Sequence, residues 1–151
     1  MSTWTSKYFT LPELLRSRVA EKNGISNMPD ELASTRLAET AIAMDLIRSL
    51  LGTPIRVTSA YRSPALNKAI NGSKTSAHCL GYAVDFVVDD QTPYQVCLKI
   101  LKSDIRFDQL IHEFGSWTHI SFDPRFRMQT LTIADKKYVE GIREVSGKKV
   151  I

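Results

Sequence analysis

The longest regular pattern of apolar positions in the chain is helical and ends at residue 51. Pro29 and Asp30 provide a start signal, and Gly52 provides a stop signal. Between them, apolar residues recur at intervals of three and four, the spacing that gathers side chains on one face of an α-helix. These positions are Leu37, Ala41, Met44, Ile47 and Leu51. The pattern predicts one long helix from about residue 30 to residue 51.

Three shorter helices are predicted from signals at their N-termini. Each begins with a Ser or Thr that can cap the helix and has a Pro within its first turn. In the first of them Glu13 follows Thr10 at the position that completes a capping box. The predicted helices cover residues 10–24, 63–72 and 92–102.

Alternating or β-branched segments predict five short strands. They lie at residues 55–59, 82–88, 107–114, 117–122 and 130–133, and Gly115-Ser116 provides a tight turn between the third and fourth. A basic tail with Lys136, Lys137, Lys148 and Lys149 is expected after the last strand. Helices and strands do not alternate regularly, which favours an α+β fold with a small antiparallel sheet packed with helices. Without repeats or linker-like segments, residues 1–151 are predicted to form a single domain.

Composition narrows the range of functions. The chain has 43% hydrophobic and 24% charged residues, as in ordinary globular proteins. No apolar run is long enough to insert in a membrane. The N-terminal segment is interrupted by charges and lacks a signal-peptide pattern, so synthesis in the cytoplasm is expected. Cys79 and Cys97 are too few for a disulfide framework. We expect a monomer.

The net charge of +4, with a pI near 9.1, implies attraction to polyanions such as nucleic acid or the anionic bacterial wall. No nucleic-acid-binding motif accompanies this charge. Nucleic-acid binding therefore rests on charge alone, and we predict no nucleic-acid partner.

Two metal-capable side chains lie on predicted strands, opposite the apolar faces. Asp85 shares a face with small residues, while the bulky residues around it alternate onto the other face. His119 likewise lies opposite Ile120 and Phe122. Taken alone, each is typical of a solvent-facing carboxylate or a structural histidine. If the two strands are neighbours in one sheet, the two side chains can meet.

His78 is a third candidate ligand, in a predicted loop seven residues before Asp85. Gly81 would allow a tight turn that returns the imidazole over the start of the strand. Two histidines and one carboxylate suit a catalytic zinc ion that keeps one coordination position open. The residues alone leave open whether the metal is zinc or another divalent ion.

The segment from Ser76 to Asp85 resembles the S-x-H-x-x-G-x-A-x-D signature of the zinc D-Ala-D-Ala carboxypeptidases, peptidase family M15. Trp117-Thr-His119 is similar to the W-x-H element of that family, and the segment from Ser59 to Ser63 is similar to S-G-Y-R-S. The likeness extends from Tyr8 to Pro124 and is closest to short single-domain bacterial and phage members. It implies a D-Ala-D-Ala carboxypeptidase/hedgehog-like fold whose sheet carries Zn²⁺ on His78, Asp85 and His119.

The resemblance also implies a carboxylate that acts as the general base. In several branches of the family this carboxylate lies three residues before the last histidine, where this chain has Ser116. A three-residue loop of residues 114–116 would instead place Glu113 on the ligand face, and a two-residue loop would place His112 there. We predict Glu113 as the base, with His112 as the alternative.

Three further residues are predicted to face the substrate. By the resemblance, the Arg62 guanidinium binds a substrate carboxylate or a developing oxyanion. Ser76 holds the substrate or supports the ligand segment, and Trp117 lines the cleft.

The expected function is zinc-dependent hydrolysis of D-Ala-containing stem or cross-link peptides of peptidoglycan, by a carboxypeptidase or an endopeptidase. A phage endolysin or wall hydrolase that reaches the cell wall after release fits this expectation, and a cytoplasmic bacterial dipeptidase is the alternative. A different class is a metal-stabilised binding module, because hedgehog domains resemble this fold without peptidase activity. The presence of Glu113 and Arg62 favours an enzyme.

Overall fold

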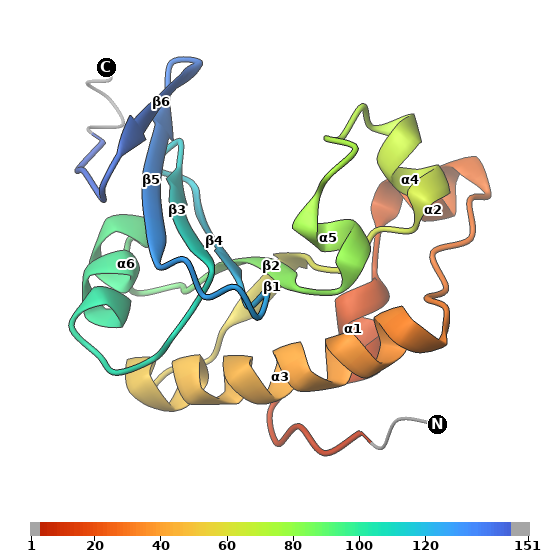
Figure 1. Cartoon of the computed structure of the whole chain (residues 1–151), viewed down its shortest axis with the longest axis horizontal. Helices are drawn as coiled ribbons and strands as arrows, with labels where there is room; N and C mark the ends of the chain where they lie inside the picture. Colours follow the sequence, from red (N-terminus) through yellow and green to blue (C-terminus); the bar gives the residue numbers. More distant parts are fainter. Residues whose placement is uncertain (1–3, 146–151) are drawn as a thin grey trace.

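A computed structural model describes residues 4–145 and has a six-stranded sheet with helices packed around it (Figure 1). The strand order is β1-β2-β4-β3-β5-β6, and all neighbours are antiparallel except β3 and β5, which are parallel. The strands are β1 (Arg56–Ser59), β2 (Ala83–Val87), β3 (Gln109–Glu113), β4 (Trp117–Ser121), β5 (Gln129–Ala134) and β6 (Lys137–Glu140). The predicted α+β class is confirmed, and the sheet is mixed rather than wholly antiparallel.

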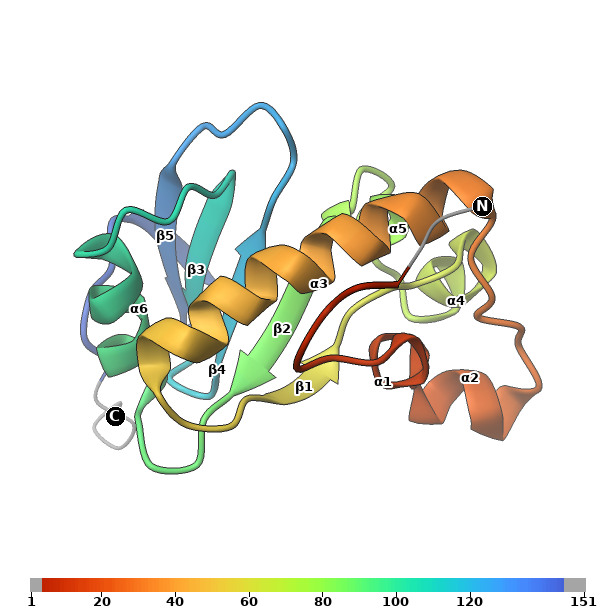
Figure 2. The same ribbon diagram turned by 90° about the horizontal axis from the view of Figure 1, so that it is seen from below.

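The main core lies between the sheet and two helices, α3 (Glu31–Leu51) and α6 (Pro93–Leu101). In Figure 2 the long helix α3 crosses the sheet, with α6 beside its C-terminal end. Asp30 caps α3 by accepting the Ala33 N–H at 2.8 Å, and Gly52 ends it in the left-handed conformation. The predicted long helix is therefore confirmed. Alternation along β2 buries Val84 and Phe86 completely in this core, and each such side chain contributes about 1.5–3 kcal/mol.

The N-terminal region forms two helices, α1 (Leu11–Leu15) and α2 (Arg18–Asn23), where one continuous helix was predicted. The chain becomes extended at Arg16, and Ser17 caps α2 by accepting the Ala20 N–H. The Leu14 carbonyl accepts the Tyr61 N–H at 3.0 Å, which joins the end of α1 to the segment after β1. The prediction was wrong because the Ser17 hydroxyl offers the backbone an alternative to a continuing helix.

Two short helices follow β1 and lie away from β3 and β5 in Figure 1: α4 (Pro64–Ala69) and α5 (Ala77–Leu80). α4 begins at the predicted Ser63-Pro64 signal. α5 replaces the loop that was expected around His78, so that part of the prediction was wrong. Its single turn starts at Ser76, whose hydroxyl accepts the His78 N–H at 3.2 Å.

The C-terminal part of the described chain forms the hairpin of β5 and β6, where a basic tail was expected after residue 133. Asp135 and Lys136 form its two-residue turn, both in the left-handed region, with φ of +48° and +65°. Such turns match the twist of paired strands but usually contain Gly or Asn, so Asp135-Lys136 was not recognisable as a hairpin turn from its residues. Lys137 begins β6, and Lys148 and Lys149 lie outside the described residues.

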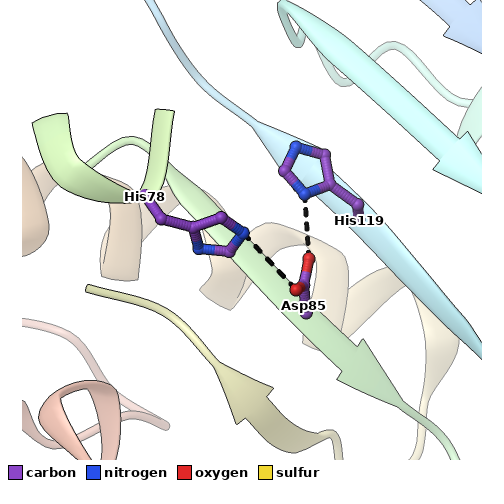
Figure 3. Close-up of side chains that lie close together, drawn as sticks. All are labelled: His78, Asp85 and His119. Carbon is purple, nitrogen blue, oxygen red and sulfur yellow. Dashed lines mark hydrogen bonds and ion pairs between the residues drawn. The ribbon is translucent and has the colours of Figure 1, made fainter. Parts of the chain in front are cut away.

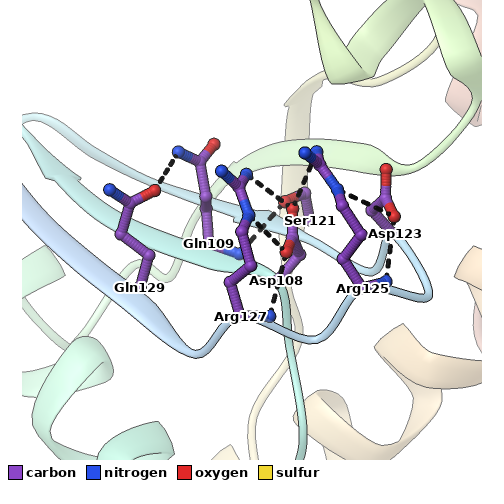
Figure 4. A network of polar contacts seen from close by, with 7 residues as sticks. All are labelled: Asp108, Gln109, Ser121, Asp123, Arg125, Arg127 and Gln129. Carbon is purple, nitrogen blue, oxygen red and sulfur yellow. Dashed lines mark hydrogen bonds and ion pairs between the residues drawn. The ribbon is translucent and has the colours of Figure 1, made fainter.

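A buried carboxylate joins the crossover between β4 and β5 to the start of β3 (Figure 4). Asp108 is 1% exposed and accepts two hydrogen bonds of 2.8 Å from the Arg127 side chain and one of 3.0 Å from its backbone N–H. Arg125 adds a contact of 3.4 Å. These bonds hold the crossover in the position that allows β5 to pair in parallel with β3.

The D108N variant is expected to lower the free energy of unfolding by about 1–3 kcal/mol at pH 7, because Arg127 loses its charged acceptor. Hydrogen bonds from Arg127 lower the pKa of Asp108, although burial opposes them. The stability that the Asp108 carboxylate contributes is therefore fully present above the unfolded pKa of about 3.9. This stability is lost as pH falls through the folded pKa of Asp108. Urea unfolding across this pH range should show a weaker acid dependence in the variant.

The matched control is D89N, which removes the exposed ion pair of Asp89 with Arg56. That pair is open to solvent, so its loss should cost roughly 0.5 kcal/mol or less. Equal losses in the two variants would contradict the structural role assigned to Asp108.

Candidate metal centre

His78, Asp85 and His119 converge from α5, β2 and β4 (Figure 3). His119 Nδ1 lies 2.8 Å from Asp85 Oδ1, and His78 Nε2 lies 3.4 Å from Asp85 Oδ2. The potential ligand atoms of all three residues lie within 4.8 Å of one another, and all three side chains are buried. Within residues 4–145, no other trio of His, Cys, Asp or Glu side chains converges in this way.

Sheet register accounts for one half of this convergence. Asp85 and His119 are direct partners in the antiparallel pairing of β2 with β4, so their side chains project from the same face. Val84 precedes Asp85 and Ile120 follows His119, and these two residues also pair with each other across β2 and β4. Both are fully buried in the core on the other face of the sheet. The apolar alternation that builds the core therefore also fixes where the two polar side chains lie.

Gly81 accounts for the other half, because it ends α5 and returns the chain to β2. Its φ is +88°, in the left-handed region, and its N–H donates to the carbonyls of Ala77 and His78. Its own carbonyl accepts the buried Thr40 hydroxyl of α3 at 2.7 Å. The turn and its anchor place His78 over the start of β2.

We expect G81A to destabilise the protein by about 2–4 kcal/mol and to weaken metal binding. A Cβ at Gly81 would lie 3.0 Å from the Ala33 carbonyl oxygen and 3.1 Å from the Arg36 Cβ. The control is G24A, since Gly24 has φ +65° but no atom within 4 Å of the added methyl. G24A should show only the conformational cost of about 1–2 kcal/mol and normal metal affinity. Thermal unfolding and zinc titration measure both effects, and identical behaviour of the two variants would refute the packing argument.

Hydrogen bonds and charge prepare the three side chains to bind a cation. His78 Nδ1 donates to the Ala60 carbonyl at 2.6 Å, so Nε2 faces Asp85 with a free lone pair. Burial lowers the pKa of His78, which keeps the ring neutral. Burial alone would raise the pKa of Asp85, but the hydrogen bond from His119 and the proximity of both imidazoles hold the pKa well below its usual range. A neutral imidazole and an ionised carboxylate are the forms that bind a metal.

The backbone joins His78 to the segment that carries Arg62. The Arg62 N–H donates to the His78 carbonyl at 3.2 Å, while the His78 ring donates to the Ala60 carbonyl. The Arg62 side chain, 20% exposed, places Nη2 3.8 Å from Asp85 Oδ2. The structure therefore brings the predicted substrate arginine to the edge of the cluster.

Glu113 lies on the ligand face, with Oε2 3.8 Å from His119 Nδ1. Glu113 pairs with Trp117, so the β3–β4 loop has three residues, with Phe114 and Gly115 at positive φ. Burial, followed by the nearby charge of Asp85, raises the pKa of Glu113 to about 7. A carboxyl group with such a pKa can accept and release a proton near neutral pH.

His112 lies on the opposite face of β3, where it is 1% exposed and its Nδ1 donates to the Arg143 carbonyl at 2.8 Å. The two-residue loop that would have placed His112 beside the cluster does not form.

A family model described as Peptidase M15 matches residues 7–121. The chain belongs to the peptidase M15 family. The matched range contains the metal-binding candidates, Arg62 and Glu113, and ends at the last residue of β4, before the β5–β6 hairpin. Peptidases of this family are typically zinc-dependent, and the two imidazoles and one carboxylate suit zinc.

No individual curated protein matches the chain significantly. None of the helices described is both long and apolar enough to cross a membrane.

Two other predicted site residues of this M15 family member have structural contacts. The Ser76 hydroxyl caps α5, and the Trp117 ring lies against Phe114 with ring centroids 5.5 Å apart and a tilt of 53° between the rings. The indole Nε1 of Trp117 is buried without a hydrogen-bond partner among the described residues. Cys79 is a free, partly exposed thiol outside the cluster. Substrate contacts by Ser76 and Trp117 stay predictions.

Sequence reasoning missed the groups that orient the M15 cluster. They include the Ala60 carbonyl behind His78 and the Thr58 hydroxyl, which donates to the Asp85 carbonyl at 3.2 Å. A backbone carbonyl has no signature in a sequence. Thr58 lies in a strand where a β-branched residue is ordinary, so neither could have been singled out.

Proposed function

We propose that this member of the M15 family is a zinc-dependent peptidase that hydrolyses D-Ala-containing stem or cross-link peptides of bacterial peptidoglycan. The observation that carries the proposal is the set of groups gathered at one buried site. His78, Asp85 and His119 converge there, and Glu113 and Arg62 each lie 3.8 Å from a member of that cluster. A purely structural metal site is closed by four protein ligands and needs neither a buried carboxyl group nor a guanidinium beside it.

In this proposal His78 Nε2, Asp85 and His119 Nδ1 hold the ion. When held by these residues, zinc would supply a Lewis acid for the scissile carbonyl and for the attacking water near neutral pH. Glu113 accepts the proton of the attacking water and transfers it to the leaving amine, a role that its position 3.8 Å from His119 on the ligand face allows. The Glu113 side chain is 15% exposed, which limits the access of bulk water to its carboxyl group.

Arg62 has the complementary role at the substrate. Its guanidinium is mostly buried beside Asp85, so its planar N–H donors are available at short range to a substrate carboxylate or to the oxygen that gains charge during attack. Trp117, next to His119 on the same face, offers an apolar surface to the peptide.

The biological setting that we propose follows from the resemblance to short single-domain bacterial and phage members of the family. The protein would act on the cell wall as an endolysin or wall hydrolase, by an endopeptidase or a carboxypeptidase reaction. Its net charge of +4 would assist contact with an anionic wall.

The test is to incubate the zinc-loaded protein with purified peptidoglycan and identify the released peptides by mass spectrometry. Free D-Ala would identify a carboxypeptidase, and cleaved cross-links would identify an endopeptidase. The matched control is D85N, which should release neither. Binding of peptidoglycan without any new peptide, under conditions where zinc is bound, would overturn the proposal in favour of a binding module.

A further inference from the structure

A cavity of about 510 Å³ lies between α1, α2, β1 and α4, outside the metal cluster. Figure 2 shows these helices at the end of the molecule toward which β1 leads. Four of its lining residues are arginines and one is acidic: Arg16, Arg18, Arg56 and Arg62, with Glu13. Of these four arginines, only Arg62 has a role in the proposed hydrolysis.

The charges of this cavity are only partly compensated. Arg16 and Arg18 are exposed, and neither pairs with a carboxylate in the part of the chain that the structure describes. Glu13 completes the capping box of α1, where its carboxylate accepts the Thr10 N–H at 3.3 Å. Arg56 pairs with Asp89 at 2.8 Å. The cavity therefore keeps a surplus of positive charge that suits an anionic ligand.

Two residues that line the cavity also adjoin the metal cluster. Arg62 lines it and also lies 3.8 Å from Asp85. Ser59 lines it and is the register partner of Asp85 across β1 and β2. β1 is an edge strand, which pairs only with β2 in the described part of the chain. An extended peptide can lie along such an edge, with one end at the cluster and a side group among the arginines.

We propose that this arginine-lined cavity binds a free carboxylate of the peptide substrate, away from the bond that is cut. The inference rests on the proposed function and adds a substrate class, acidic peptides. A guanidinium binds a carboxylate through two parallel hydrogen bonds, which an uncharged amide cannot replace equally. In stem peptides the isoglutamyl residue carries such a carboxylate, and amidation removes its charge with little change in shape.

The experiment compares two synthetic stem peptides that differ only in D-isoglutamate or amidated D-isoglutamine. The zinc-loaded protein is expected to have a roughly tenfold higher kcat/KM for the acidic peptide. The double variant R16Q/R18Q should lose this preference through a higher KM for the acidic peptide, with kcat unchanged. The control K102Q removes an exposed cation at the end of α6 and should keep the preference. Calorimetric binding of both peptides to E113Q provides a readout without turnover.

The outcomes separate this inference from the function on which it rests. Failure of the zinc-loaded protein to cut either peptide, together with no release of peptides from cross-linked peptidoglycan, would contradict the proposed function, and equal binding of the two peptides to E113Q would overturn the cavity assignment. Hydrolysis of both peptides with equal kcat/KM, or a preference that survives in R16Q/R18Q, would overturn the cavity assignment alone. Inorganic polyphosphate serves as a competitor. If it binds more tightly than the acidic peptide and loses affinity in the same variant, the cavity is a general polyanion site and the peptide assignment is wrong.

Discussion

E113Q is expected to lower kcat by at least about 100-fold while leaving zinc bound. The amide of Gln has nearly the shape of the carboxylate but cannot accept the proton of the attacking water. Because Glu113 lies 3.8 Å from His119 and outside the converging trio, its replacement should leave the ion in place. Hydrolysis of a stem peptide and zinc content by elemental analysis measure the two effects separately.

His112, the histidine outside the metal cluster, supplies the control for E113Q. H112Q changes a side chain on the opposite face of the same strand, so it should keep both zinc and a nearly normal kcat as long as the protein folds. Near-normal turnover in E113Q would remove Glu113 from the role of base.

D85N is expected to lower zinc affinity by more than about 100-fold and to abolish hydrolysis. Changes to residues that merely orient a ligand already cost about 10–100-fold, and Asp85 is the one anionic group of the trio. In metal-free protein the same change should cost about 1–3 kcal/mol, since the hydrogen bond from His119 loses its charged acceptor.

Thermal unfolding with and without zinc provides a direct measurement. An ion that binds only the folded state at about 100 times its Kd adds about 2.7 kcal/mol of stability. Wild-type protein should show this gain and D85N should not. D108N, which is destabilised at a distance from the cluster, should keep the zinc-dependent gain. A similar gain in D85N would mean that zinc binds elsewhere.

The parts of the fold that the sequence predicted are those where local pattern and tertiary packing agree. The start and end of α3 follow from Asp30 and Gly52, because the same residues that satisfy the helix ends also bracket the apolar stripe. The faces of β2 and β4 follow from strict alternation, since slipping either strand by one residue would expose Phe86 or Ile120. That constraint made the meeting of Asp85 with His119 predictable once the strands were neighbours.

The parts that the sequence did not predict depend on contacts between distant segments. The break between α1 and α2 follows from a hydroxyl cap and from the bond between Leu14 and Tyr61. The parallel pairing of β5 with β3 depends on Asp108, buried under Arg127. In the sequence Asp108 resembled any other charged residue beside a strand.

Two hydrogen bonds link residues 60–62 to His78, one between backbone groups and one from the His78 ring, and together they have a consequence for engineering. The segment of residues 60–62 carries the Arg62 guanidinium. Its Ala60 carbonyl also accepts the hydrogen bond from the His78 ring. In the proposed function, peptide selection and cation retention would share one stretch of main chain. Directed evolution that alters residues 60–62 to accept new peptides will change the hold on the ion at the same time, so selections for altered specificity should be run at fixed free zinc.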